Sequence, residues 1–311
     1  MTTKPRRWCS SLTATAIALA LGIASSGSAQ TLEYDVQRAL EYGQHDGVKL
    51  TGNLYAPKRS GKYPTLVAVH GGGWQAGNAS TYQHWGPYLA QRGYVVFSID
   101  YRLVRDGRKM YPEAVHDVRA AVQFLRSRGE AIKVDPDRIG LIGDSAGAHL
   151  VALVALVGDK PPFAGSYKDD PYSGVSTRVK VCVGIYGVYD MAAQWEHDLV
   201  HRPFDNIVQK FLGAALVEDR RTFFEASPLS YVTRDNNQTS VLLAWGTEDD
   251  IVDRRTQSNA FLIALKQAGF FVRSVIVQGA PHFWAVDPIE ETNSFSGFLA
   301  PRLLRFLQDR L

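Results

Sequence analysis

Residues 141–150, LIGDSAGAHL, form the stretch that decides the fold. An apolar run ends at Gly143, and a helix is predicted to start just after Ser145. The sharp turn between them would hold the serine in a strained backbone conformation, and glycine at 143 and 147 leaves room for the neighbouring elements. The helix N-terminus stabilises negative charge that develops beside the serine. We therefore predict that Ser145 is a nucleophile; the alternative is an ordinary turn with a helix-capping serine.

Short apolar runs rich in β-branched residues recur along the chain, as expected for strands buried on both faces. They cover residues 65–71, 94–101, 138–144, 179–187, 241–246 and 271–279. Helical patterns are found at residues 112–129, 253–269 and 295–311, the last with Pro301 as an expected break or kink. Residues 33–44 and 48–57 flank HDG and predict an antiparallel hairpin.

This alternation predicts an α/β fold with a mostly parallel central sheet and helices on both faces. We expect one domain over residues 30–311, with residues 190–230 as a small helical cap inserted between two strands.

A second glycine-rich stretch, VAVHGGGWQAG, covers residues 67–77. Three consecutive glycines after a buried strand let backbone N–H groups approach a ligand without obstruction by side chains. An oxyanion hole uses such donors. A flexible loop or a phosphate cradle is the alternative, but WQAGNAS lacks the lysine that a phosphate loop needs.

The first 29 residues have the pattern of a secretory signal peptide. Lys4, Arg6 and Arg7 precede an uncharged apolar run, and small residues lead up to Ala29. The apolar run is shorter than the roughly 20 residues that a membrane anchor needs. We therefore expect cleavage after Ala29, export to the periplasm or medium, and no stable membrane insertion.

Loss of these three basic residues from the chain's 34 leaves 31, equal to its 31 acidic residues. A neutral chain gives no reason to expect nucleic acid as a partner. Cys182 would be the single remaining cysteine, and its apolar surroundings in the sequence predict a core residue.

The stretch WGTEDDIVD, residues 245–253, places four carboxylates after a predicted strand: Glu248, Asp249, Asp250 and Asp253. A serine hydrolase of this type needs the chain order serine, acid, histidine, and all four satisfy it. Asp253 also suits a helix cap. His282 follows the last predicted strand and is the expected general base.

His197 and His201 have the spacing of a zinc-binding pair but lack the HExxH pattern, so we expect no metal and no cofactor.

Seven motifs together resemble the α/β-hydrolase superfamily, in particular the branch of hormone-sensitive-lipase-like and acetylxylan and feruloyl esterase-like proteins. They are HGGGW, IDYRL, YPEAVHDVRAAVQFLR, VDPDRIGLIGDSAGAHL, FFEASPLSYV, GTEDDIVD and QGAPHFW, and they span about residues 45–310. The combination is far more specific than any one motif.

The resemblance implies a catalytic triad of Ser145, Asp249 and His282. It selects Asp249 because the family places the acid two residues after the Gly-Thr pair and before an apolar pair, here Ile251 and Val252. It also implies an oxyanion hole made by the N–H groups of Gly72, Gly73 and Ala146.

We expect hydrolysis of small acyl or cell-wall-type esters. Trp74, Tyr186, Trp195 and Trp284, with Phe204, are candidate aromatic pocket walls, although such residues are as often core. Two alternatives stay open: an amide or peptide hydrolase of formamidase-like or prolyl-peptidase-like type, and a non-catalytic binding protein on the same scaffold. The complete triad argues against the last, and the oligomeric state is not predicted.

Overall fold

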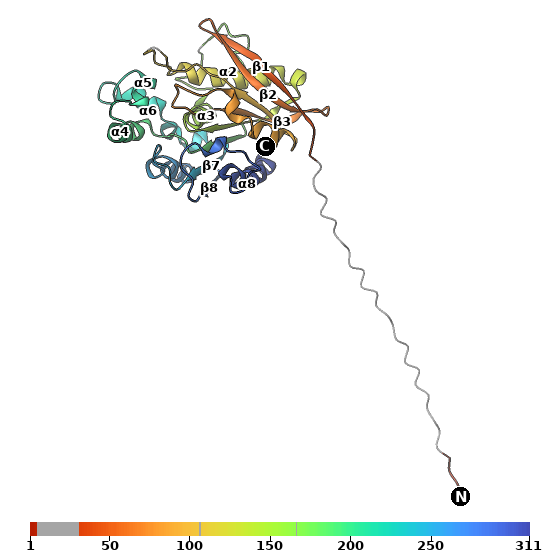
Figure 1. Ribbon diagram of the computed structural model, residues 1–311. Helices are drawn as coiled ribbons and strands as arrows, with labels where there is room; N and C mark the ends of the chain where they lie inside the picture. The colour runs from red at the N-terminus through yellow and green to blue at the C-terminus, as the bar shows by residue number, and fades with distance from the viewer. Residues whose placement is uncertain (5–30, 106, 166) are drawn as a thin grey trace. The chain divides into compact units, whose positions relative to one another are not determined.

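The computed structural model describes residues 1–4, 31–105, 107–165 and 167–311 (Figure 1). The predicted signal peptide therefore lies outside the described residues, except for its first four. Residues Thr31–Leu311 form one compact unit. Within the described ranges, none of the helices is both long and apolar enough to traverse a lipid bilayer.

An eight-stranded sheet forms the centre of this unit, in the order β1-β2-β4-β3-β5-β6-β7-β8. The strands are β1 (Tyr34–His45), β2 (Val48–Pro57), β3 (Tyr63–Val69), β4 (Val95–Ile99), β5 (Val134–Asp144), β6 (Val181–Ile185), β7 (Ser240–Gly246) and β8 (Val272–Val277). The predicted hairpin pairs antiparallel, β2 pairs antiparallel with β4, and all further neighbours are parallel. The prediction of a mostly parallel sheet is confirmed.

Eight α-helices are described: α1 (Trp85–Ala90), α2 (Glu113–Arg128), α3 (Ala146–Val157), α4 (Met191–His201), α5 (Ile207–Leu212), α6 (Arg220–Ala226), α7 (Ala260–Gln267) and α8 (Phe295–Arg310). Side chains of α2, α3 and α7 pack on one face of the sheet, and those of α1 and α8 on the other. Figure 1 shows α2 and α8 on opposite sides of the strands.

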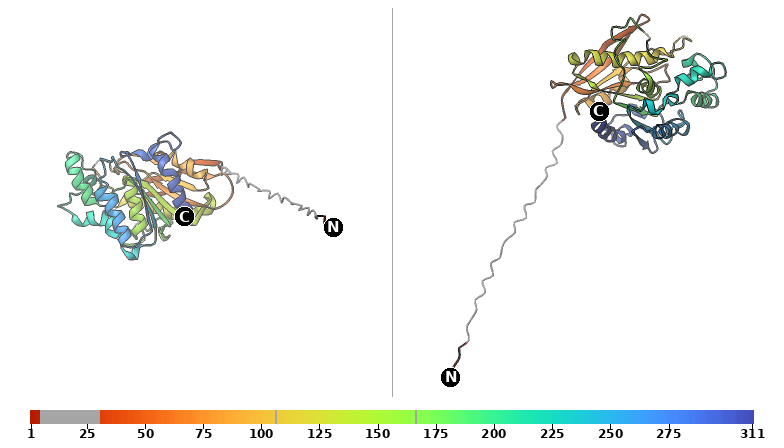
Figure 2. Two further views of the ribbon diagram at one scale, coloured as in Figure 1. Left: turned by 90° about the horizontal axis from the view of Figure 1, so that it is seen from below. Right: turned by 180° about the vertical axis from the view of Figure 1, so that it is seen from behind.

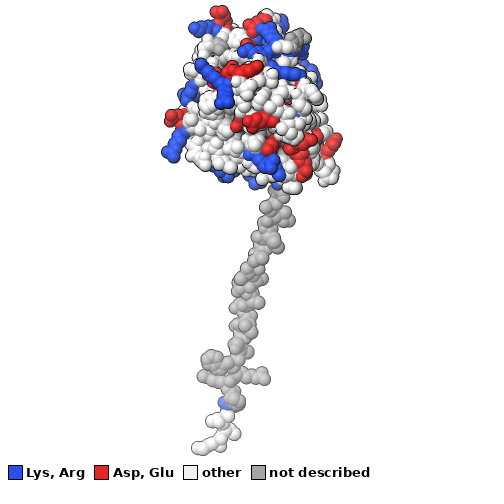
Figure 3. Space-filling view, turned by 90° about the vertical axis from the view of Figure 1, so that its left-hand side faces the viewer, with Lys and Arg blue, Asp and Glu red and all other residues white. Residues whose placement is uncertain are grey.

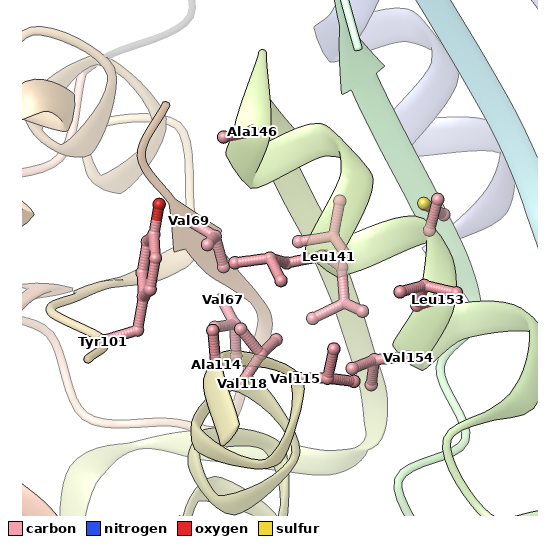
Figure 4. Packing of buried hydrophobic residues seen from close by; sticks show 14 of the residues in the cluster. Val67, Val69, Tyr101, Ala114, Val115, Val118, Leu141, Ala146, Leu153 and Val154 are labelled. Carbon is pink, nitrogen blue, oxygen red and sulfur yellow. The ribbon is translucent and has the colours of Figure 1, made fainter. Parts of the chain in front are cut away.

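The core on the first face is built from alternate strand residues and the inward stripes of two helices. Val67, Val69 and Leu141 point from β3 and β5 toward Val115 of α2 and Leu153 of α3 (Figure 4). β-Branched side chains suit both the pleated sheet and the close spacing between layers. Cys182 lies in this core, and burial raises the pKa of its thiol to about 12. The prediction that Cys182 is a core residue is confirmed.

Helices α4, α5 and α6 lie between β6 and β7, in the segment for which the sequence predicts a cap. Figures 1 and 2 show them gathered at one end of the unit. Figure 3 faces this side of the molecule and shows acidic and basic side chains interspersed rather than a uniformly basic surface.

The sequence-based expectation at Pro301 is wrong in one respect, because α8 continues through this proline without a break. Proline removes the hydrogen bond to the carbonyl four residues earlier. Pro301 is on the exposed side of the helix, where water can solvate that carbonyl.

Candidate active site

Ser145 lies at the turn between β5 and α3 in a backbone conformation that side chains rarely adopt, with φ 50° and ψ −120°. Its N–H donates to the carbonyl of Ile185 on the neighbouring strand at 2.8 Å. The flanking glycines are sterically required: a Cβ at Gly147 would lie 2.0 Å from the carbonyl oxygen of Val69, and one at Gly143 2.5 Å from Gly147. The strain is therefore held by tight packing on both sides.

Three side chains distant in sequence meet above this turn. His282 Nε2 lies 2.9 Å from Ser145 Oγ, and His282 Nδ1 lies 2.7 Å from Asp249 Oδ2. A carboxylate accepts only, so Nδ1 carries the proton and Nε2 accepts from the serine hydroxyl. Asp249 is further fixed by the N–H groups of Ile251 and Val252, which donate to Oδ1 at 3.0 and 2.9 Å.

Of the four carboxylates in residues 245–253, only Asp249 contacts His282. Glu248 and Asp250 are exposed. Asp253 accepts from the N–H of Arg255 at 3.1 Å, at the start of the helical turn Arg255–Asn259 that precedes α7. Chain order alone leaves the four carboxylates equivalent, and the structure places Asp249 beside His282.

The glycine loop is attached to the nucleophile turn by Asp144, a residue to which we assigned no role from the sequence. Its Oδ1 accepts from the N–H of Gly71 at 3.1 Å. Burial raises the pKa of this carboxyl to about 6. The position of Asp144 inside the GDSAG motif indicates that it lies near the nucleophile. The sequence does not indicate its partner, Gly71, which is 73 residues away.

Gly72, Gly73 and Ala146 line the same cavity as Ser145 and His282. Gly72 has φ 108°, and a Cβ there would lie 2.2 Å from the carbonyl oxygen of Ala76. In the described part of the chain, the N–H groups of these three residues have no protein acceptor. They are available to an oxygen bound beside Ser145.

The cavity at Ser145 has a volume of about 290 Å³. Besides the nucleophile turn and Val188, its walls come from the glycine loop, the acid loop at Ile251 and Val252, the histidine loop at Phe283, and the cap. The cap contributes Gln194, Arg202, Asp205 and Ile207. The sequence offered no pattern that would single these cap residues out.

The expected aromatic walls need correction. Trp74 lines the cavity, but its indole is fully buried, stacked on Phe211 with ring centroids 4.6 Å apart. Tyr186 and Trp284 do not line it and are core residues: the Tyr186 ring packs behind His282 at 4.4 Å, and its hydroxyl accepts from the N–H of Ala285.

Trp195 does not line the cavity either, because its ring packs edge-on against Phe223 within the cap. Phe204 is fully exposed. Of the five aromatic residues expected to line the pocket, only Trp74 lines the cavity at Ser145.

Three other histidines have structural partners. His149 Nε2 donates to the carbonyl of Ala226 at 2.8 Å, so its Nδ1 accepts from the indole N–H of Trp74 at 3.2 Å. Burial lowers the pKa of His149 to about 4, which keeps it neutral. His197 and His201 stack on each other and contact backbone carbonyls, of Asp250 and His197 respectively.

Together the fold and the site define an α/β-hydrolase of the esterase branch. The chain belongs to the BD-FAE family, whose model matches residues 53–265.

Similar proteins include the esterase LipQ of Mycobacterium tuberculosis, 31% identical over 69% of this chain and 48% of that protein. A probable isoprenylcysteine alpha-carbonyl methylesterase of Oryza sativa is 28% identical over 89% of this chain and 66% of its own length. The chain thus spans about half the length of the first of these. Esterase 2 of Thermogutta terrifontis has the same fold, with a TM-score of 0.72 at 22% identity over 89% of this chain and 94% of that one.

Proposed function

We propose that this protein is a serine carboxylic ester hydrolase. The observation that carries the proposal is the continuous chain of hydrogen bonds from Ser145 Oγ through His282 to Asp249, at 2.9 and 2.7 Å. Ester hydrolase names among the relatives support the same activity.

Catalysis begins when Ser145 Oγ attacks the ester carbonyl and its proton passes to His282 Nε2. The buried carboxylate of Asp249 holds the imidazole in the required tautomer and stabilises the imidazolium that forms. The carbonyl oxygen, now negative, accepts from the N–H groups of Gly72, Gly73 and Ala146. His282 then protonates the leaving alcohol, and water hydrolyses the acyl-enzyme by the same route.

The size of the cavity supports small substrates, because its volume of about 290 Å³ is at the low end for a ligand pocket. We infer short acyl groups, with acetyl and other cell-wall-type esters as the natural candidates.

The test compares hydrolysis of p-nitrophenyl acetate, butyrate and octanoate by the processed protein and by Ser145→Ala. We expect activity on the short esters and a fall of roughly 10³-fold or more in the variant, since the nucleophile is lost. Equal rates for the two proteins on every ester would contradict the proposal. Turnover of p-nitroanilides instead of esters would favour an amide hydrolase, and binding without turnover a non-catalytic protein.

The pattern of residues 1–29 supports export with cleavage after Ala29. Mass spectrometry of the protein from fractionated cells tests this, with Gln30 as the expected N-terminal residue. An intact Met1 end in the cytosolic fraction would contradict it.

A further inference from the structure

Cap helix α4 is hydrogen-bonded to the loop that carries Asp249. The carbonyl of Ile251 accepts from Gln194 Nε2 at 3.0 Å, and Arg202 Nη2 approaches the same oxygen at 3.5 Å. The next N–H in the chain, that of Val252, donates to Asp249 Oδ1 at 2.9 Å. The Ile251–Val252 peptide group therefore connects Gln194 to the acid.

This connection transmits orientation because a peptide group is planar. A C=O held toward Gln194 directs the N–H of the same unit, on Val252, toward Asp249. Hydrogen bonds at the two ends of one peptide group also polarise each other in a poorly solvated site. The position of Gln194 therefore affects one of the two N–H groups that hold Asp249 Oδ1, that of Val252.

Asp198 fixes both cap donors. Its Oδ1 accepts from Gln194 Nε2 at 2.9 Å and from Arg202 Nη2 at 2.7 Å. The Asp198 side chain is fully buried, and Gln194 is 1% exposed. Since burial of a charged pair contributes little net stability, a role in geometry accounts better for its presence. We call Gln194, Asp198 and Arg202 the cap latch.

Other hydrogen bonds also join the cap to the acid loop and to the residues that follow that loop. Gln257, beyond the acid loop, accepts from the N–H groups of Tyr189 and Asp190 at 2.7 and 2.8 Å, and donates to the carbonyl of Asp190 at 2.9 Å. His197 Nε2 contacts the carbonyl of Asp250 at 3.2 Å. The N–H of the same peptide group, on Ile251, donates to Asp249 Oδ1 at 3.0 Å, so His197 also reaches the acid through one peptide group. The latch differs because Gln194 and Asp198 are buried, whereas the His197 contact is exposed.

We propose that Asp198 is a positioning residue for Asp249, acting through Gln194 and the Ile251–Val252 peptide group to keep the carboxylate in line with His282. This inference rests on the proposed function, because it assigns Asp249 to the catalytic triad. Asp198 itself does not line the cavity at Ser145.

The test uses a matched pair of variants. Asp198→Ala removes the shared acceptor. Asp198→Asn keeps one acceptor oxygen at Oδ1 and changes Oδ2, which has no hydrogen-bond partner among the described residues. We expect the alanine variant to lose roughly 10-fold in kcat with little change in KM, because misplacement affects the chemical step. The asparagine variant should retain most of kcat.

A spectroscopic readout separates positioning from stability. The His282 Nδ1 proton, in a 2.7 Å hydrogen bond to Asp249, should give a low-field proton resonance in NMR. It should broaden or move upfield in Asp198→Ala and persist in Asp198→Asn. Gln194→Met removes the donor to the carbonyl of Ile251 with little change in side-chain size. It should have the same effect on the resonance as Asp198→Ala, and it takes the place of Asp198→Ala if the latter does not fold.

Gln123→Ala is the control. Gln123 is a buried glutamine of α2 that donates to the carbonyls of Ser173 and Val175, away from the cavity at Ser145. It should lower the Tm but leave kcat and the resonance unchanged. Two results would overturn the proposal. One is an unchanged resonance and an unchanged kcat in both Asp198→Ala and Gln194→Met; the other is a loss of kcat in Asp198→Asn as large as that in Asp198→Ala. If the wild-type protein hydrolyses no ester, the proposed function fails, while the resonance still tests the latch.

Discussion

Asp144 shows how one side chain beside the nucleophile affects both geometry and pH dependence. It holds Gly71 of the glycine loop, and its side chain is buried next to Ser145. Burial raises the pKa of its carboxyl from 3.8 to about 6, since a charged carboxylate loses hydration there. The folded state therefore binds a proton at Asp144 more tightly than the unfolded chain does.

The sign of the effect on stability follows from this difference. The contribution of Asp144 is fully present below pH 3.8 and is lost as the pH rises through about 6. Asp144→Asn keeps an acceptor for the N–H of Gly71 and removes the titration. We expect the fall in unfolding free energy between pH 4 and pH 7 to be smaller in the variant by roughly 2 kcal/mol. Urea denaturation at both pH values checks this, and identical pH dependence in the two proteins would refute it.

At the scale of the element, α8 illustrates a helix whose packing overrides a local preference. Leu299, Leu303, Phe306 and Leu307 bury one side of the helix against the sheet. This continuous apolar stripe accounts for the helix passing through Pro301, where local chemistry predicts a break or kink.

Pro301→Ala should stabilise the protein. Alanine restores the missing hydrogen bond and removes the clash of the proline ring, an effect partly offset by the greater freedom of the unfolded chain. We expect a gain of roughly 1–2 kcal/mol, seen as a higher Tm in thermal unfolding. Gln308→Ala, at another exposed position of α8, serves as the control and should change Tm little. A lower Tm for Pro301→Ala would show that the proline fits the helix better than alanine.

At the scale of the whole molecule, a buried ionic cluster joins the N-terminal hairpin to the rest of the fold. Asp117 of α2 accepts from Arg102 Nη2 at 2.8 Å and contacts His45 Nδ1, at the hairpin turn, at 2.8 Å. Asp170 approaches the other ring nitrogen of His45 at 3.2 Å. Three segments distant in sequence therefore meet at one fully buried carboxylate, and Asp170 joins them through His45.

Asp117→Ala should destabilise the protein strongly, because it leaves the buried guanidinium of Arg102 without its main partner. Loss of one member of a buried pair costs about 3–5 kcal/mol. Urea unfolding measures the change. Glu33→Ala, which breaks an exposed ion pair with Lys58, is the comparison and should alter stability little. Equal effects of the two substitutions would argue against a structural role for the cluster.

Much of the fold was predictable because its signals are local. Buried strands, the amphipathic stripe of α2 and the glycine-flanked turn at Ser145 each depend on a few neighbouring residues, and all appear where the sequence indicates. The hydrogen bonds that were not predicted join residues that are far apart in the sequence. Gln194 meets Ile251 across 57 residues, and Asp144 meets Gly71 across 73.

The sequence by itself determined the class of fold, the nucleophile turn, the glycine loop and the order of serine, acid and histidine, since backbone sterics and hydrophobic periodicity encode these within short stretches. Tertiary structure decided which aromatic residues line the cavity and how the cap holds the acid loop. It also shows by geometry that Asp249, the carboxylate that the family resemblance selects, is the one that reaches His282. The physical reason is that a hydrogen bond depends on distances of about 3 Å between side chains. Only the packing of helices on the sheet and of the cap against the acid loop sets those distances.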